Sequence, residues 1–285
     1  MDSTLTVLSV LTAFGLYLTS LTAAGMIFTL MLHRPVLGGL PLYRWILWCV
    51  VGAVVFACLA FALTATALTG TLSGMFDRAM LGLMWDTPVG DAFRMRVIGL
   101  VIIAAALLIS WIGDWVAAVG AAVVLGSFVQ VGHVGAAAGT LGEIVLFLHL
   151  STIALWMGVL APLRTLAARA NTQWQAGDLG HQFGRQALVL LPVLIAAGVF
   201  LTWSILPSAA AVWTVYGLSL LGKIACVAVL LGLGALNKTR YVPGVRNGDA
   251  TAVSGLRSTL LVEWVMFAAV LLATAILTNA VTLPT

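Results

Sequence analysis

Charged side chains are scarce in this sequence. Only 8% of its 285 residues are Asp, Glu, Lys or Arg, whereas soluble domains carry about 25%. Because charged residues are what a soluble protein turns toward water, a globule of this length could not cover its surface with so few. The composition, with 62% hydrophobic residues, also excludes a disordered chain. We therefore expect an integral membrane protein.

Cysteine is scarce too, and the three cysteines lie in apolar runs without CxxC spacing. This excludes a disulfide framework, and we interpret Cys49, Cys58 and Cys226 as small buried side chains. The sequence has no P-loop, so ATP-driven pumping is not expected. No basic segment precedes the first apolar run, so no cleavable signal peptide is predicted. We attribute the net charge of +4 to membrane topology and not to nucleic-acid binding.

The apolar runs are long enough to cross a bilayer as helices. A span needs about 20 residues, and the runs lack the alternation of a β-barrel. We predict an all-α, polytopic fold of eight transmembrane helices, with residues 1–140 as a first four-helix half and 141–285 as a second. Gly113 and Asp114 are expected to form the turn between the third and fourth spans. The predicted spans are 5–32, 45–70, 90–113, 115–138, 142–166, 186–206, 213–237 and 257–281.

Lys and Arg are distributed unevenly along these spans. Nine lie at the loops after the first, fifth and seventh spans, and three lie toward the opposite side. Under the positive-inside rule the nine are cytoplasmic. Both termini would then be periplasmic in a bacterial inner membrane.

A short motif occurs twice and indicates an internal duplication. It reads T-x-x-G-x5-[R/K], at Thr87–Arg96 and, 127 residues later, at Thr214–Lys223. Each copy opens the third span of its half from the outside. Because each half has four spans, both halves share one orientation, and a parallel duplication is predicted.

Two histidines are predicted to lie inside the membrane at similar depth. His133 precedes the outer end of the fourth span by about five residues, and His149 lies about seven residues into the fifth. At 1.5 Å per residue both would be roughly 8–10 Å below the outer surface, on adjacent antiparallel helices. Neutral imidazoles bind copper, zinc and haem iron. The alternative is two separately hydrogen-bonded core histidines. His33 and His181 are expected in solvated cytoplasmic loops.

Met84 and Glu143 are candidates for a further ligand. Thioethers suit Cu(I), and carboxylates with imidazole suit Cu(II). Met80 and Met84 would share one face of a short helix, which is equally typical of an interfacial helix lying on the membrane. Glu143, at the outer end of the fifth span, is also consistent with an acid that interacts favourably with the helix dipole.

Three ionisable residues, Arg96, Lys223 and Glu263, are predicted to lie within the bilayer. A lysine at the centre of a span costs about 3 kcal/mol on insertion scales. We predict that Lys223 pairs with Glu263 and that Arg96 has the matching role in the first half. The alternative is that the two cations bind an anion, such as haem propionates, or repel ions along a path.

The second half contains a recognisable succession of residues. Its members are His149, Trp156, Gly158, Thr214, Tyr216, Gly217, Lys223, Asn237 and Glu263. This succession resembles the copper resistance protein D (CopD) family of bacterial inner-membrane proteins. The resemblance covers about residues 145–280, and it extends more loosely to the first half through the first copy of the repeated motif and through Gly132-His133. Two positions depart from the family pattern, because Val159 follows Gly158 and Gly184 follows Phe183.

The resemblance implies an eight-helix protein that handles copper between periplasm and cytoplasm. Our first hypothesis is a copper transporter and not an enzyme. Copper would arrive from a separate periplasmic CopC-like carrier and bind His133 and His149. The second hypothesis is a membrane cytochrome that holds haem b between the same two histidines. A homo-oligomer embedded in membrane lipid is compatible with both. The visible spectrum of the purified protein discriminates between copper and haem.

Overall fold

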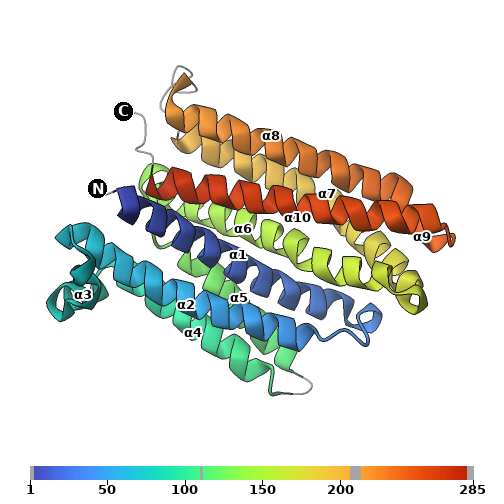
Figure 1. Cartoon of the computed structure of the whole chain (residues 1–285), viewed down its shortest axis with the longest axis horizontal. Helices are drawn as coiled ribbons and strands as arrows, with labels where there is room; N and C mark the ends of the chain where they lie inside the picture. Colours follow the sequence, from blue (N-terminus) through green and yellow to red (C-terminus); the bar gives the residue numbers. More distant parts are fainter. Residues whose placement is uncertain (1–2, 110–111, 206–212, 281–285) are drawn as a thin grey trace.

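The computed structural model describes residues 3–109, 112–205 and 213–280, apart from the side chains of residues 133–137, 205 and 215. The described residues form helices and no strand (Figure 1), so the predicted all-α fold is confirmed. Six of their helices are long and apolar enough to cross a membrane. These six are α1 (Ser3–His33), α2 (Leu42–Thr69), α6 (His133–Ala168), α7 (Gln173–Ile205), α8 (Val215–Leu236) and α10 (Ala250–Asn279).

Two further helices lie alongside these six. Helix α4 (Pro88–Ala106) has 19 residues and carries Asp91, Arg94 and Arg96. Helix α5 (Gly113–Ser127) is apolar but has only 15 residues. The two pack against each other, and they also contact α2 and α1 respectively. The short elements are η1 (Arg34–Val36), η2 (Leu72–Phe76), α3 (Arg78–Trp85), η3 (Ala170–Thr172), a π-helical turn η5 (Asn237–Tyr241) and α9 (Val242–Arg246).

The long helices run side by side, and α1 begins at the same end of the bundle at which α10 finishes (Figure 1). A hydrogen bond of 3.4 Å between the hydroxyls of Tyr17 and Thr278 joins the two helices. At the opposite end, Arg34 forms an ion pair of 2.9 Å with Asp114, which attaches the α1–α2 connection to the start of α5. The bundle therefore has two distinct ends, each with its own polar contacts.

The predicted third and fourth spans are wrong at their boundaries. Helix α4 ends at Ala106, and Gly113 and Asp114 begin α5 instead of forming a turn. Gly113 packs so closely on the Ala106 carbonyl that a Cβ would overlap it. Helix α5 ends at Ser127, eleven residues before the predicted end at 138. Apolar composition alone did not reveal these ends, because the connecting residues are themselves apolar.

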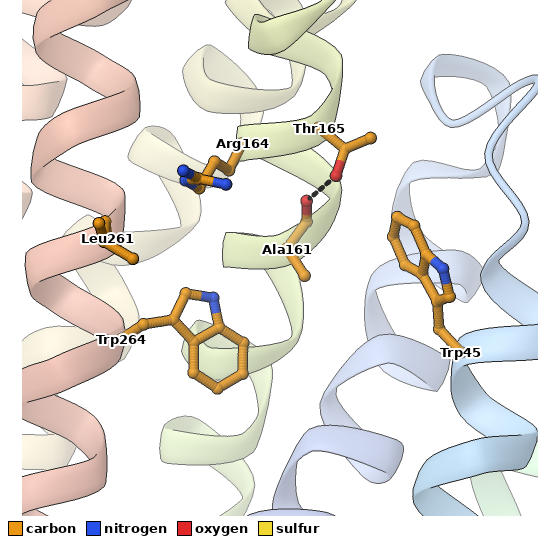
Figure 2. Close-up of a pocket in the computed structure, with 6 residues that line it drawn as sticks. All are labelled: Trp45, Ala161, Arg164, Thr165, Leu261 and Trp264. Carbon is orange, nitrogen blue, oxygen red and sulfur yellow. Dashed lines mark hydrogen bonds between the residues drawn. The ribbon is translucent and has the colours of Figure 1, made fainter.

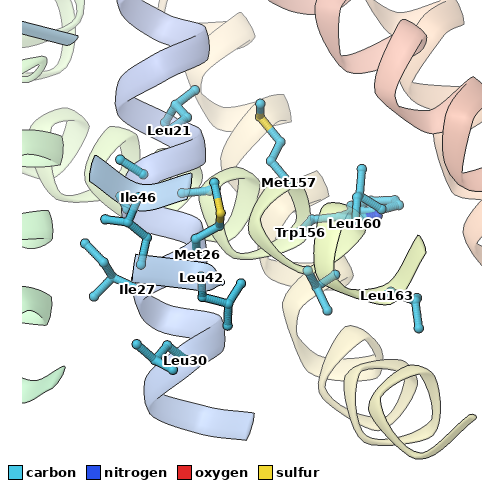
Figure 3. Packing of buried hydrophobic residues seen from close by; sticks show 14 of the residues in the cluster. Leu21, Met26, Ile27, Leu30, Leu42, Ile46, Trp156, Met157, Leu160 and Leu163 are labelled. Atoms are coloured by element: carbon cyan, nitrogen blue, oxygen red, sulfur yellow. The ribbon is translucent and has the colours of Figure 1, made fainter. Parts of the chain in front are cut away.

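Helices α1 and α6 cross in backbone contact at Gly25 and Gly158. A Cβ at Gly25 would overlap the carbonyl of Ala154, and a Cβ at Gly158 would overlap the backbone of Gly25. Small residues are what allow membrane helices to approach so closely, because lipid provides no hydrophobic force between them. Buried side chains from both helices, Met26 and Met157 among them, pack around this crossing (Figure 3).

We predict that Gly158→Ala lowers the free energy of unfolding by about 1–3 kcal/mol, as overpacking of a filled core does. The matched control is Gly222→Ala in α8, where an added Cβ meets nothing within 4 Å. The control should keep or raise stability, since alanine is the better helix former. Equilibrium unfolding in mixed micelles measures both. Equal stabilities of the two variants would contradict the close crossing.

Candidate functional site

His149 lies on α6 and faces α7. Its Cε1 is 3.6 Å from where a Cβ on Gly198 would lie, and its ring lies near the backbone of Leu194. Its Nδ1 is buried and has no hydrogen-bond partner among the described residues. Buried polar atoms are almost always bonded. The lone pair of this nitrogen is therefore available to a bound group that can accept it.

Lys223 of α8 lies within electrostatic range of His149. It is half-buried. No hydrogen bond or ion pair joins Lys223 to any residue in the described part of the chain, Glu263 included. The predicted Lys223–Glu263 pair is therefore wrong. The two oxygens of the Glu263 carboxylate instead accept hydrogen bonds from neutral donors, Trp156 and Asn237.

Glu263 is the most deeply buried acid, with 1% of its surface exposed. The Trp156 indole N–H donates to its Oε2 at 2.9 Å, and the Asn237 amide donates to its Oε1 at 2.6 Å. The Thr259 hydroxyl lies 2.5 Å from Oδ1 of Asn237 and orients that amide. Phe267 packs edge-on against Trp156, with ring centroids 5.5 Å apart. The network connects α6, α10 and the turn η5 that follows α8.

Local sequence features position this network. Trp156 lies next to the Gly158 crossing, and its ring packs over Gly234 of α8 at 3.2 Å from a notional Cβ. Asn237 begins the π-helical turn η5, a distortion that is frequent at functional sites. Thr259 is the member that sequence analysis missed. It precedes Glu263 by four residues, so the helical repeat places both on one face of α10.

Arg96 of α4 is buried and has neutral partners. Its Nε donates to Ser127 Oγ at 3.1 Å, and its guanidinium lies 4.6 Å from the centre of the Phe128 ring. Tyr17 lies within its electrostatic range. Ion pairs in the described part of the chain do not include Arg96. Polarisable and hydroxyl groups therefore stabilise this charge in the first half.

The two copies of the repeated motif occupy equivalent places. Thr87 immediately precedes α4, and Thr214 immediately precedes α8. The Thr87 hydroxyl donates to the Met84 carbonyl at 2.7 Å, whereas Thr214 Oγ1 accepts from the Gly217 amide at 3.2 Å. Tyr216, beside this cap, is half-buried. The threonines therefore shape the starts of the two helices.

The candidate ligands are not brought together by the described residues. His133 begins α6 and is not on the preceding helix as predicted, and its side chain lies outside the described residues. Met84 is buried on α3, which packs on α2 and α4, whereas His149 faces α7. Glu143 is half-buried on α6, six residues before His149 and so about 120° away around the helix. No cluster of three His, Cys, Asp or Glu occurs among the described residues.

His33 is not the solvated loop residue that we predicted. It is the last residue of α1 and is 1% exposed. Its ring nitrogens form hydrogen bonds of 2.9 Å with Gln182 and 3.1 Å with Gln186 on α7. The two glutamines are one helical turn apart and bracket the imidazole. His181 is exposed, as expected, but it lies on α7 and not in a loop.

Long apolar helices with buried polar side chains between them define a multi-pass membrane protein. Residues 3–143 match the family model of the copper resistance protein D-like, N-terminal domain, and residues 177–277 match that of copper resistance protein D. The chain belongs to the copper resistance protein D family, so its process is copper resistance or homeostasis. No curated protein and no solved structure matches it.

We predict that Trp156→Phe lowers the free energy of unfolding by about 1–3 kcal/mol, because the buried Glu263 carboxylate loses a donor. The loss should be smaller in a Glu263→Gln background, where no full charge is left unsatisfied. Trp48→Phe is the control, since Trp48 is 72% exposed. Equilibrium unfolding in micelles checks this. A Trp156→Phe loss no larger than that of the control would contradict the role of the indole N–H.

Proposed function

We propose that this protein moves copper across the bacterial inner membrane and receives it at His149, near the periplasmic side. The observation that carries the proposal is the buried Nδ1 of His149, which lacks a hydrogen-bond partner in the described part of the chain. A copper ion would accept the lone pair of this nitrogen, and neutral imidazole is a good ligand for either oxidation state. His133 is proposed as a second ligand, with Met84 and Glu143 as further donors.

A path inward from His149 is supported by donors on the neighbouring turns. His149 and Trp156 are seven residues apart, so they lie on one face of α6 and about 10 Å apart along its axis. The Trp156 indole N–H donates a hydrogen bond to the Glu263 carboxylate. The thioethers of Met26 and Met157 are buried at the adjacent α1–α6 crossing. Soft sulfur donors suit Cu(I), and a carboxylate suits Cu(II).

We further propose that α4 and α5 complete an eight-span bundle made of two parallel-related halves. The supporting helix contacts are repeated between the two halves. The α1–α5 contact corresponds to the α6–α10 contact, and the α1–α10 contact corresponds to the α5–α6 contact. Helix α4 is about 28 Å long and α5 about 22 Å. Against a hydrocarbon core of about 30 Å, the bilayer would thin beside α5.

The remaining proposals concern partners. A separate periplasmic CopC-like carrier would deliver copper at the end of the bundle at which α1 begins. A homo-oligomer would place the exposed apolar faces of two copies together in the membrane. The haem b alternative requires a second axial ligand beside His149, and His133 is the residue proposed for it.

We predict that His149→Ala reduces copper accumulation by cells, and copper bound to the purified protein, by at least about tenfold. Loss of an outer-shell partner alone typically costs 10–100-fold in metal affinity. His181→Ala is the control, because it makes the same chemical change at a histidine that is exposed on α7. Metal analysis of the detergent-purified proteins gives the stoichiometry.

Full copper stoichiometry in the His149→Ala protein would refute the proposed site. A Soret band in the wild-type spectrum that disappears in His149→Ala would support the haem b alternative instead. Glu263→Gln separates entry from passage: it should leave copper binding at His149 intact while lowering transport into proteoliposomes.

We predict that both termini are periplasmic. Fusions of a periplasm-active reporter after residue 285 should be active, and fusions after Asn247 in the α9–α10 connection should be inactive. The physical reason is the concentration of Lys and Arg at the latter end. Inactive fusions at both residue 285 and Asn247 would mean that α10 does not cross the membrane, which would contradict the eight-span bundle.

A further inference from the structure

A cavity of about 210 Å³ lies between α2, α6 and α10. It is near the end of the bundle at which α6 finishes and α2 and α10 begin (Figure 2). Leu261, which lines it, is 51% exposed, and the adjacent Val262 and Val265 are exposed too. The cavity therefore opens among apolar, lipid-facing side chains. Its lining residues are Trp45, Ala161, Arg164, Thr165, Leu261 and Trp264.

Arg164 is the charged residue of this cavity. Its Nε is buried, and it has no hydrogen-bond partner among the described residues. Two other arginines at this end of the bundle are paired, Arg34 with Asp114 at 2.9 Å and Arg246 with Asp178 at 3.6 Å. Leaving a buried donor unsatisfied costs free energy. Arg164 therefore requires an acceptor that this part of the chain does not supply.

Two tryptophans flank the arginine. Trp264 projects from α10 toward the cavity, and Trp45 lies on its α2 side (Figure 2). Tryptophan is enriched at membrane–water interfaces, where its ring contacts lipid and its N–H meets polar groups. Neither indole N–H donates to another residue described here. Further donors are thus available beside the guanidinium.

We propose that this cavity binds a phosphate group, namely the phosphodiester headgroup of an anionic membrane phospholipid, with Arg164 as its principal ligand. The planar guanidinium matches phosphate oxygens in a bidentate geometry. Basic pockets between transmembrane helices are a known form of headgroup site. The acyl chains would lie along the exposed apolar faces of α2 and α10. Free phosphate has the same oxygen chemistry, but it would have to enter from an apolar surface.

The test compares lipid adducts by native mass spectrometry of the full-length protein in detergent. The probes are phosphatidylglycerol and a diacylglycerol with the same chains, which lacks phosphate. Arg164→Gln should lower phosphatidylglycerol adducts about tenfold, the usual effect of losing a charged hydrogen bond, and should leave diacylglycerol adducts unchanged. Arg169→Gln is the matched control, because Arg169 is exposed at the end of the same helix.

A second variant tests the cavity without touching the charge. Ala161→Leu would fill the space beside Arg164 and should lower phosphatidylglycerol adducts as well. A parallel experiment adds millimolar inorganic phosphate in place of the lipid and measures the melting temperature. An Arg164-dependent rise in melting temperature with phosphate, without phosphatidylglycerol adducts, would assign the same site to free phosphate. The proposal is overturned if both variants bind phosphatidylglycerol like wild type, or if Arg169→Gln loses as much as Arg164→Gln.

Discussion

The backbone contact between α1 and α6 is the constraint on which the other helices depend. Helix α1 also packs on α2, α5 and α10, and α6 also packs on α7 and α10, so these two helices form the centre of the bundle. Gly25 and Gly158 let them approach until no side chain fits between them. Lipid tails are as apolar as the helix surfaces, so the hydrophobic effect does not drive these helices together. Close van der Waals contact is therefore what selects one helix arrangement. The depth and facing of His149 and Trp156 follow from it.

The second constraint is electrostatic, because the bundle must hold an acid within apolar surroundings. It does so with neutral donors from Trp156 and Asn237 and not with a cation. Paired charges would bring a second desolvation cost, whereas an indole and an amide satisfy the oxygens at smaller cost. The Glu263 side chain therefore connects three elements of the bundle through hydrogen bonds.

The basic residues inside the bundle have a different chemistry from the acid. Arg96 is stabilised by Ser127 and the Phe128 ring. Lys223 has no ion-pair partner in the described part of the chain, and His149 lies within its electrostatic range. Lys223 therefore lies near the proposed copper ligand and is not paired with Glu263.

The sequence by itself determined the class of protein, the positions of most apolar spans and the family, because apolar run length and motif order are local properties. It also singled out Trp156, Asn237 and Glu263. Only the tertiary structure decided which polar groups meet. It separated Lys223 from Glu263, buried His33 between two glutamines of α7, and ended α5 well before His133. The sequence of an apolar span does not indicate which face of its helix is turned toward the other helices. Packing between helices, as at Gly25 and Gly158, sets those rotations, and the rotations decide which polar side chains of different helices meet.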